Sequence, residues 1–126
     1  MVKGLFLIGI GSFVGGIARY LSQQFVQVNF PSSIPAGTLT VNIVGCFIIG
    51  LVYALSGKGN LISPELRMLL ATGFCGGFTT FSSFAYENFS LLRENDFFYS
   101  FLYLIFSVAG GLLAVYAAII LISIIF

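Results

Sequence analysis

Residues 72–87 read TGFCGGFTTFSSFAYE and lie in the third of four long apolar regions of the chain. Two adjacent glycines, Gly76 and Gly77, are followed by hydroxyl residues interleaved with phenylalanines. The hydroxyl residues are Thr79, Thr80, Ser82 and Ser83. Glycine weakens helix propagation and hydroxyl groups compete for backbone carbonyls, so the stretch favours a broken helix deep in a membrane. Close packing of helices at the two glycines is the alternative that the spacing leaves open.

The composition is that of a membrane protein. The chain has 126 residues, of which 59% are hydrophobic and 7% are charged, and its mean hydropathy is +1.09. A bilayer core of roughly 30 Å needs about 20 apolar residues per helix, so the chain has room for about four spans. We therefore expect an all-α membrane protein without a soluble catalytic domain, and not an enzyme.

A single transmembrane domain is expected over residues 1–126. The four spans are expected at about 4–25, 36–56, 66–92 and 97–124. The first is expected to be retained rather than cleaved, because no small-residue cleavage signature follows it. The polar stretch 23–35, QQFVQVNFPSSIP, predicts an exposed loop, and Ser63, Pro64 and Glu65 read as N-cap, first residue and first-turn acid of the third helix.

Several function classes have little support. The net charge is +1 and the chain has no basic run, so nucleic acid is not an expected partner. Cys46 and Cys75 lie in apolar segments of a chain without histidine or a CxxC motif, which removes the usual zinc and thioredoxin-like sites. Both are expected to be small buried hydrophobic residues.

The basic residues predict only a weak preference for one orientation in the membrane. Lys3, Lys58 and Arg67 fall on one side and Arg93 on the other, with Arg19 in the first span near that second side. Such a chain can insert both ways. Four helices of this size form a thin bundle, and its polar groups need partners other than lipid. An antiparallel homodimer, with its two-fold axis in the membrane plane, would supply them.

The broken third span suggests binding of a cation. Carbonyl groups freed at a break must face protein, water or an ion rather than lipid. Carbonyls from two copies, without a carboxylate, suit a hard monovalent cation, and sodium is the obvious candidate.

The same stretch also suggests a route for an anion. Thr80, Ser83, Phe84 and Glu87 share one helical face by their spacing, and Phe81 lies beside Phe84. The positive edges of phenyl rings can favour a small anion without trapping it as a buried Lys or Arg would. Ordinary packing of the two phenylalanines and a solvated helix end for Glu87 remain alternatives.

Asn42 lies in the middle of the second span, where an unpaired amide is costly. It is expected to bond either another helix or a permeating species.

Three motifs together resemble the small fluoride-channel family known as Fluc or CrcB proteins. They are GGIARY at 15–20, TLTVNIVGCFIIG at 38–50 and GFCGGFTTFSSF at 73–84. The resemblance covers nearly the whole chain. It implies dual-topology homodimers with two antiparallel pores, which export fluoride passively across the bacterial cytoplasmic membrane and thereby confer fluoride resistance.

The resemblance also implies roles for individual residues. Phe81 and Phe84 match the paired pore phenylalanines and Asn42 the pore asparagine, while the carbonyls of Gly76 and Thr79 from both subunits would hold Na⁺. Further pore-lining or vestibule residues are then Thr80, Ser83, Tyr103, Ser107, Glu87 and Arg19. Ser83 stands where family members often have threonine, so the hydroxyl is kept and a methyl group is missing.

Two other functions can be weighed against a fluoride channel. A small dual-topology, proton-coupled exporter of lipophilic cations has a similar size, but its chemistry needs a carboxylate deep in the first span, and residues 4–25 contain no acid. A non-transporting membrane subunit would account for the glycines, but not for the hydroxyl groups and phenylalanines that follow them.

Overall fold

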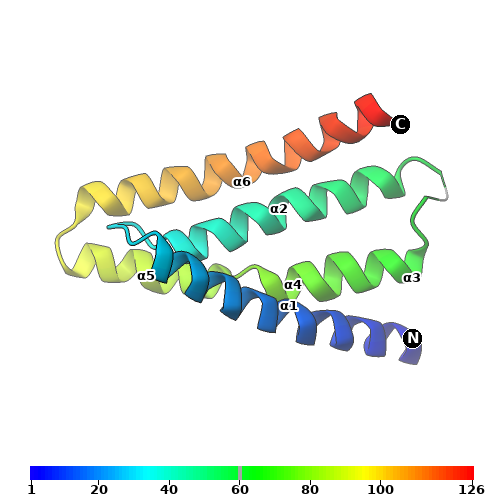
Figure 1. The fold of residues 1–126 in the computed structure, drawn as a ribbon, viewed down its shortest axis with the longest axis horizontal. Helices are drawn as coiled ribbons and strands as arrows, with labels where there is room; N and C mark the ends of the chain where they lie inside the picture. The colour runs from blue at the N-terminus through cyan, green and yellow to red at the C-terminus, as the bar shows by residue number, and fades with distance from the viewer. Residues whose placement is uncertain (60) are drawn as a thin grey trace.

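The chain runs back and forth in four helical arms (Figure 1). The computed structural model describes residues 1–59 and 61–126, and within them all regular structure is helical. The arms are α1 (Val2–Asn29), α2 (Ala36–Ser56), a composite third arm (Pro64–Arg93) and α6 (Phe97–Ile125). Each arm is long and apolar enough to cross a membrane. The predicted all-α, four-span fold is confirmed.

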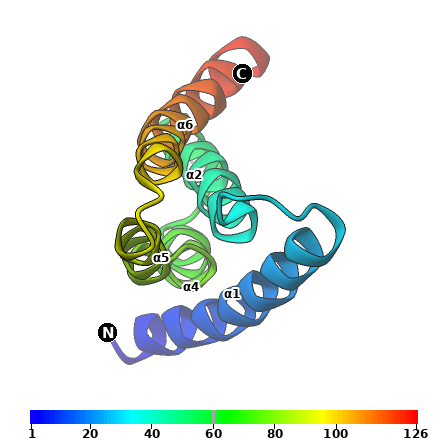
Figure 2. The same ribbon diagram turned by 90° about the vertical axis from the view of Figure 1, so that its left-hand side faces the viewer.

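The first helix is longer than expected. The polar stretch that begins at Gln23 was expected to be a loop, and this was wrong, because α1 continues as a helix to Asn29. Gln, Val and Phe are all tolerated in a helix, and the first proline within this stretch is Pro31. Figure 2 shows α1 lying across one side of the other arms.

The third arm is interrupted. It consists of α3 (Pro64–Arg67), the π-helix η1 (Met68–Cys75), α4 (Gly76–Phe78) and α5 (Phe81–Arg93). Ser63 caps the start, accepting a hydrogen bond from the Leu66 N–H at 3.1 Å, as predicted. The predicted break is confirmed, but it lies at Thr79 and Thr80, whose ψ angles of 159° and 113° are extended. Gly76 and Gly77 themselves are helical.

Glycine contacts hold the arms close together. A Cβ atom on Gly77 would lie 2.5 Å from the Ser12 carbonyl oxygen of α1, so this glycine serves the close packing that was the alternative reading. A Cβ on Gly76 would meet no atom within 4 Å. On the other side, α2 and α6 pack along their length, with Gly50 against Val115 and Ala118.

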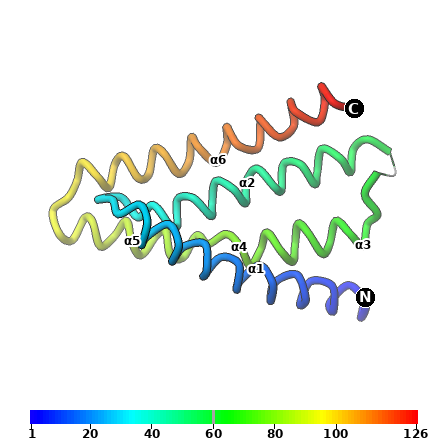
Figure 3. The backbone as a smooth tube through the Cα atoms, in the orientation of Figure 1, coloured from blue at the N-terminus to red at the C-terminus, as the bar shows by residue number. Residues whose placement is uncertain are grey.

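Both termini and the turn between α2 and α3 lie at one end of the protomer (Figure 3). The α1–α2 loop and the α5–α6 turn lie at the other end. The α5–α6 turn is made by Asn95, whose φ of 64° is in the left-handed region that asparagine tolerates. Since the ends of the arms face opposite sides of a membrane, the break between α4 and α5 lies between them, at depth.

Candidate site at the helix break

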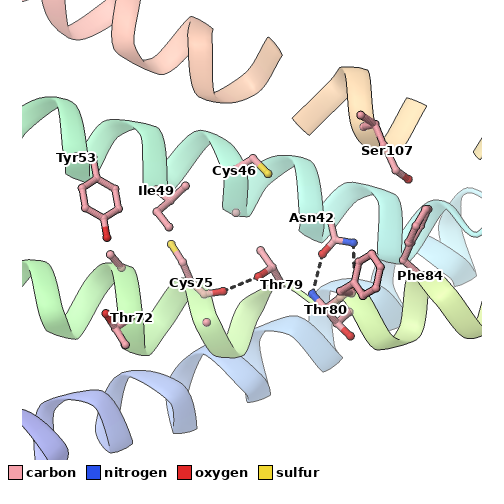
Figure 4. A pocket seen from close by; sticks show the side chains of 15 residues that line it. Asn42, Cys46, Ile49, Tyr53, Thr72, Cys75, Thr79, Thr80, Phe84 and Ser107 are labelled. Carbon is pink, nitrogen blue, oxygen red and sulfur yellow. Dashed lines mark hydrogen bonds between the residues drawn. The ribbon is translucent and has the colours of Figure 1, made fainter. Parts of the chain in front are cut away.

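One side chain of α2 binds both backbone groups at the break. The Asn42 amide nitrogen donates to the Thr80 carbonyl at 3.1 Å, and the Thr80 N–H donates to the Asn42 amide oxygen at 2.8 Å (Figure 4). These bonds replace the ones that Thr80 would make in a continuous helix. Of the two partners expected for Asn42, the structure gives it another helix.

The carbonyl groups before the break have unequal partners. The Cys75 carbonyl accepts from the Thr79 N–H at 3.0 Å and from the Thr79 hydroxyl at 2.8 Å (Figure 4). The Gly77 carbonyl accepts from the Arg19 guanidinium at 3.1 Å. In residues 1–59 and 61–126, the carbonyls of Gly76 and Thr79 accept no hydrogen bond. They are the two carbonyls for which the resemblance implies a cation.

A cavity of about 570 Å³ extends along α2, the third arm and α6. Tyr53 and Thr72 line one end and Phe84 and Ser107 the other, with the break between them (Figure 4). Seven of the predicted site residues line it: Asn42, Gly76, Thr79, Thr80, Phe81, Phe84 and Ser107. None of the described residues around this cavity is charged.

The two phenylalanines of α5 lie in different surroundings. Their ring centroids are 5.7 Å apart, but Phe81 is 77% exposed in the protomer while Phe84 is half-buried. The rings of Phe84 and Tyr103 meet edge to face at 5.0 Å, with an interplanar angle of 61°. Nearby, the buried hydroxyl oxygen of Ser107 has no hydrogen-bond partner among the residues that the structure describes. An aromatic wall and an unused hydroxyl thus border the same end of the cavity.

Thr80 and Ser83 form the start of α5. The Thr80 hydroxyl oxygen accepts from the Ser83 N–H at 3.2 Å and caps the helix, and the two hydroxyl groups are 3.1 Å apart. Competition of hydroxyl groups for backbone partners, which predicted the break, therefore acts here as a helix cap.

A polar network contains three further predicted residues: Glu87, Tyr103 and Arg19. The Glu87 carboxylate accepts from the Tyr103 hydroxyl at 2.9 Å and from the Thr38 hydroxyl at 3.0 Å. Tyr103 and Thr38 are fully buried. The solvated helix end considered for Glu87 is therefore not its environment. Arg19 reaches the same network through Gln23, whose amide oxygen accepts from the guanidinium at 3.3 Å.

Sequence reasoning missed Thr38 and Gln23. The Gln23 amide nitrogen donates to the Thr38 hydroxyl oxygen at 3.0 Å and so joins α1 to α2. Thr38 begins the motif TLTVNIVG and its position was a usable signal. Gln23 falls where the expected first span, about 4–25, overlaps the expected loop, 23–35, and none of the three motifs includes it.

The fold and the site define a class: a small helical membrane protein with four spans, whose third span is broken beside an uncharged, aromatic cavity. The chain belongs to the family described as CrcB-like protein, Camphor Resistance (CrcB), whose model matches residues 6–119. The resemblance drawn from the three motifs is confirmed.

Individual relatives match over nearly their full lengths. The chain is 55% identical over 115 residues to the fluoride-specific ion channel FluC of Chlorobium phaeobacteroides (strain BS1), covering 89% of this chain and 87% of that protein. It is 50% identical over 119 residues to the protein of the same name from Gloeothece citriformis, covering 94% and 96%. A third, from Leptospira interrogans serovar Lai, is 46% identical over 110 residues, covering 87% of each chain.

Proposed function

We propose that this protein is a fluoride-selective channel that conducts fluoride passively across the bacterial cytoplasmic membrane. The observation that carries the proposal is its 55% identity to a relative named as a fluoride-specific ion channel, over 89% of the chain. The family match over residues 6–119 and the four spans support it. The proton-coupled exporter has no such support, since neither the family nor the relatives carry that description.

The chemistry of the cavity suits a small anion. Fluoride is strongly hydrated, so a pore must replace its water with donors and with positive ring edges. Among the residues that the structure describes, the cavity offers Phe81, Phe84, Thr80 and Ser107 and no charged side chain. An anion would therefore be held weakly enough to leave. Beyond Phe84 the route would continue past Tyr103, toward Ser83 and Glu87, with Arg19 bordering the vestibule.

A second, antiparallel copy is part of the proposal. Phe81 is 77% exposed in the protomer, and the cavity beside it is open to the outside of the bundle. A partner inverted in the membrane would cover this face and place a second break opposite the first. Two pores would then run in opposite directions along the shared surface.

Sodium is the proposed cofactor at the centre of this dimer. The Gly76 and Thr79 carbonyls accept no hydrogen bond in the described part of the chain, and both residues line the cavity. Backbone oxygens are suitable ligands for a hard cation, which would also attract an anion nearby. If the site can be emptied, replacing Na⁺ with a large organic cation should lower dimer stability in light-scattering measurements.

The test of function is fluoride efflux from liposomes, measured with an ion-selective electrode. Liposomes with purified protein should release fluoride far faster than empty liposomes, while chloride efflux stays at the empty-liposome rate. Fluoride release no faster than from empty liposomes would refute the proposal, and equal chloride release would remove its selectivity.

A further inference from the structure

A continuous chain of side-chain hydrogen bonds joins three arms of the protomer. It runs from Arg19 on α1 through Gln23 to Thr38 on α2, and from there to Glu87 on α5. The three distances are 3.3, 3.0 and 3.0 Å. Gln23 connects the guanidinium of Arg19 to the buried hydroxyl of Thr38.

In this series of hydrogen bonds, each group can donate in only one direction. A guanidinium can only donate, so the Gln23 amide oxygen must face Arg19 and its NH₂ group must face Thr38. The Thr38 hydroxyl oxygen then accepts from Gln23, and its single proton is free for Glu87. The donor of Thr38 is thereby directed toward the carboxylate that also accepts from Tyr103.

The backbone places Gln23 at this position. A Cβ atom on Gly37 would lie 2.9 Å from the Gln23 carbonyl oxygen and 3.1 Å from its Cα, so α2 can begin against this turn of α1 only with glycine there. Thr38 follows directly and is fully buried. The backbone contact between Gly37 and Gln23 therefore holds the Gln23 amide within hydrogen-bond distance of the Thr38 hydroxyl.

We propose that Gln23 is a positioning residue for anion passage: it keeps the Thr38 hydroxyl a donor toward Glu87 and so holds the carboxylate between Thr38 and Tyr103, outside the uncharged cavity. The inference rests on the proposed fluoride conduction. A carboxylate without these donors would turn toward the uncharged cavity and repel an anion there.

The substitution Gln23→Glu tests the direction of the protons. Its carboxylate keeps the size of the side chain and still accepts from Arg19, but it cannot donate to Thr38 and instead accepts the Thr38 proton. We expect fluoride efflux from liposomes to fall about tenfold, the effect of losing one hydrogen bond to a charged group. Gln23→Met removes the donor without drawing the Thr38 proton away, and should lower the rate by a smaller factor, about threefold.

Gln24→Glu is the matched control. It adds the same charge to the next residue of α1, whose side chain is exposed, and should conduct like the wild type. Elution of every variant as the wild-type dimer excludes misfolding. If Gln23→Glu does not fold, Gln23→Met carries the test, and a wild-type rate for Gln23→Met would then overturn the proposal.

A double-substitution cycle separates positioning from simple space filling. In a Thr38→Ala background the hydroxyl is gone, so Gln23→Glu should change the rate by less than about twofold. Equal losses in both backgrounds would overturn the proposal, as would equal rates for Gln23→Glu and Gln24→Glu. A wild type without fluoride flux would instead refute the proposed function itself.

Discussion

Phe81 and Phe84 are one helical turn apart on α5 and yet face different surroundings. Phe84 packs against Tyr103, lines the cavity and is half-buried, while Phe81 is 77% exposed in the protomer. A ring that points out of one subunit acts in a pore only if the partner covers it. The two residues therefore test the cavity and the dimer separately.

Replacing either ring with an aliphatic side chain should slow fluoride transport. Phe81→Ile and Phe84→Ile remove positive ring edges, each worth about 0.5–1.5 kcal/mol, so efflux should fall about twofold to tenfold. Phe101→Ile on the outer face of α6 is the control and should leave the rate unchanged. Unchanged efflux in both test variants would mean that the two rings serve packing alone.

Asn42 should be necessary for the stability of the break. Asn42→Ala leaves the N–H and carbonyl groups of Thr80 without partners, at about 1–3 kcal/mol for each group. The melting temperature in detergent should fall clearly. Asn29→Ala, which removes one exposed bond to the Phe25 carbonyl, should have almost no effect. Equal melting temperatures for the two variants would contradict the role given to Asn42.

Patterns in the sequence predicted seven of the residues that line the cavity. They also predicted Arg19, Glu87 and Tyr103 of the polar network, but not the hydrogen bonds that join them. Six of these seven cavity residues belong to the motifs at 38–50 and 73–84, whose residue types are distinctive, and Ser107 lies on α6. Gln23, Thr38 and Glu87 are 15 and 49 positions apart, so their pairing depends on how α1, α2 and α5 pack. No local pattern contains that information.

The third arm illustrates what determines a helix break. The paired glycines predicted an interruption, but the extended residues are Thr79 and Thr80, and the glycines remain helical. Gly77 packs closely against α1 as part of a helix. The backbone groups left without helical partners are those of Thr80, and the Asn42 amide binds them. The π-helix Met68–Cys75 was not predicted either, because composition and hydrophobic spacing do not distinguish its i→i+5 hydrogen bonds from those of an α-helix.

The two glycines should respond differently to a methyl group. Gly77→Ala places a carbon 2.5 Å from the Ser12 carbonyl oxygen and 3.0 Å from the Gly16 nitrogen, so α1 must move away from α4. We expect a lower melting temperature for this variant by the overpacking penalty of about 1–3 kcal/mol.

Gly76→Ala is the matched comparison. The added methyl group meets nothing within 4 Å in the protomer, so the subunit should fold normally. If a second copy covers this face, the dimer fraction in light scattering should fall. A melting temperature lowered as much as in Gly77→Ala would contradict the open surroundings of Gly76.

At the scale of the molecule, the basic residues at the two ends are expected to bias the orientation in the membrane. Lys3, Lys58 and Arg67 belong to the end with the termini, and Arg93 to the other. Arg19 bonds the Gly77 carbonyl and Gln23, so it is held within the protomer rather than in a loop. This small difference supports the proposed insertion in both orientations, which the proposed antiparallel dimer requires.

Variants with a strong orientation preference should lose activity alone and regain it together. Arg93→Gln leaves every basic residue except Arg19, which is held within the protomer, at the end with the termini. Lys3→Gln, Lys58→Gln and Glu94→Lys combined shift the excess to the other end. Each expressed alone should give little dimer and little fluoride efflux, and co-expression should restore both. Full activity from either one alone would show that opposed orientations are not needed.

An interruption inside a long helix also exposes its electrical polarity. The segment that ends at Phe78 presents the negative end of its peptide dipoles, and α5, which begins at Phe81, presents the positive end, at the same depth and only two residues away. Ions of either sign can thus be attracted to one kink by different peptide groups. These peptide groups act in addition to the formal charge that Arg19 brings to the Gly77 carbonyl.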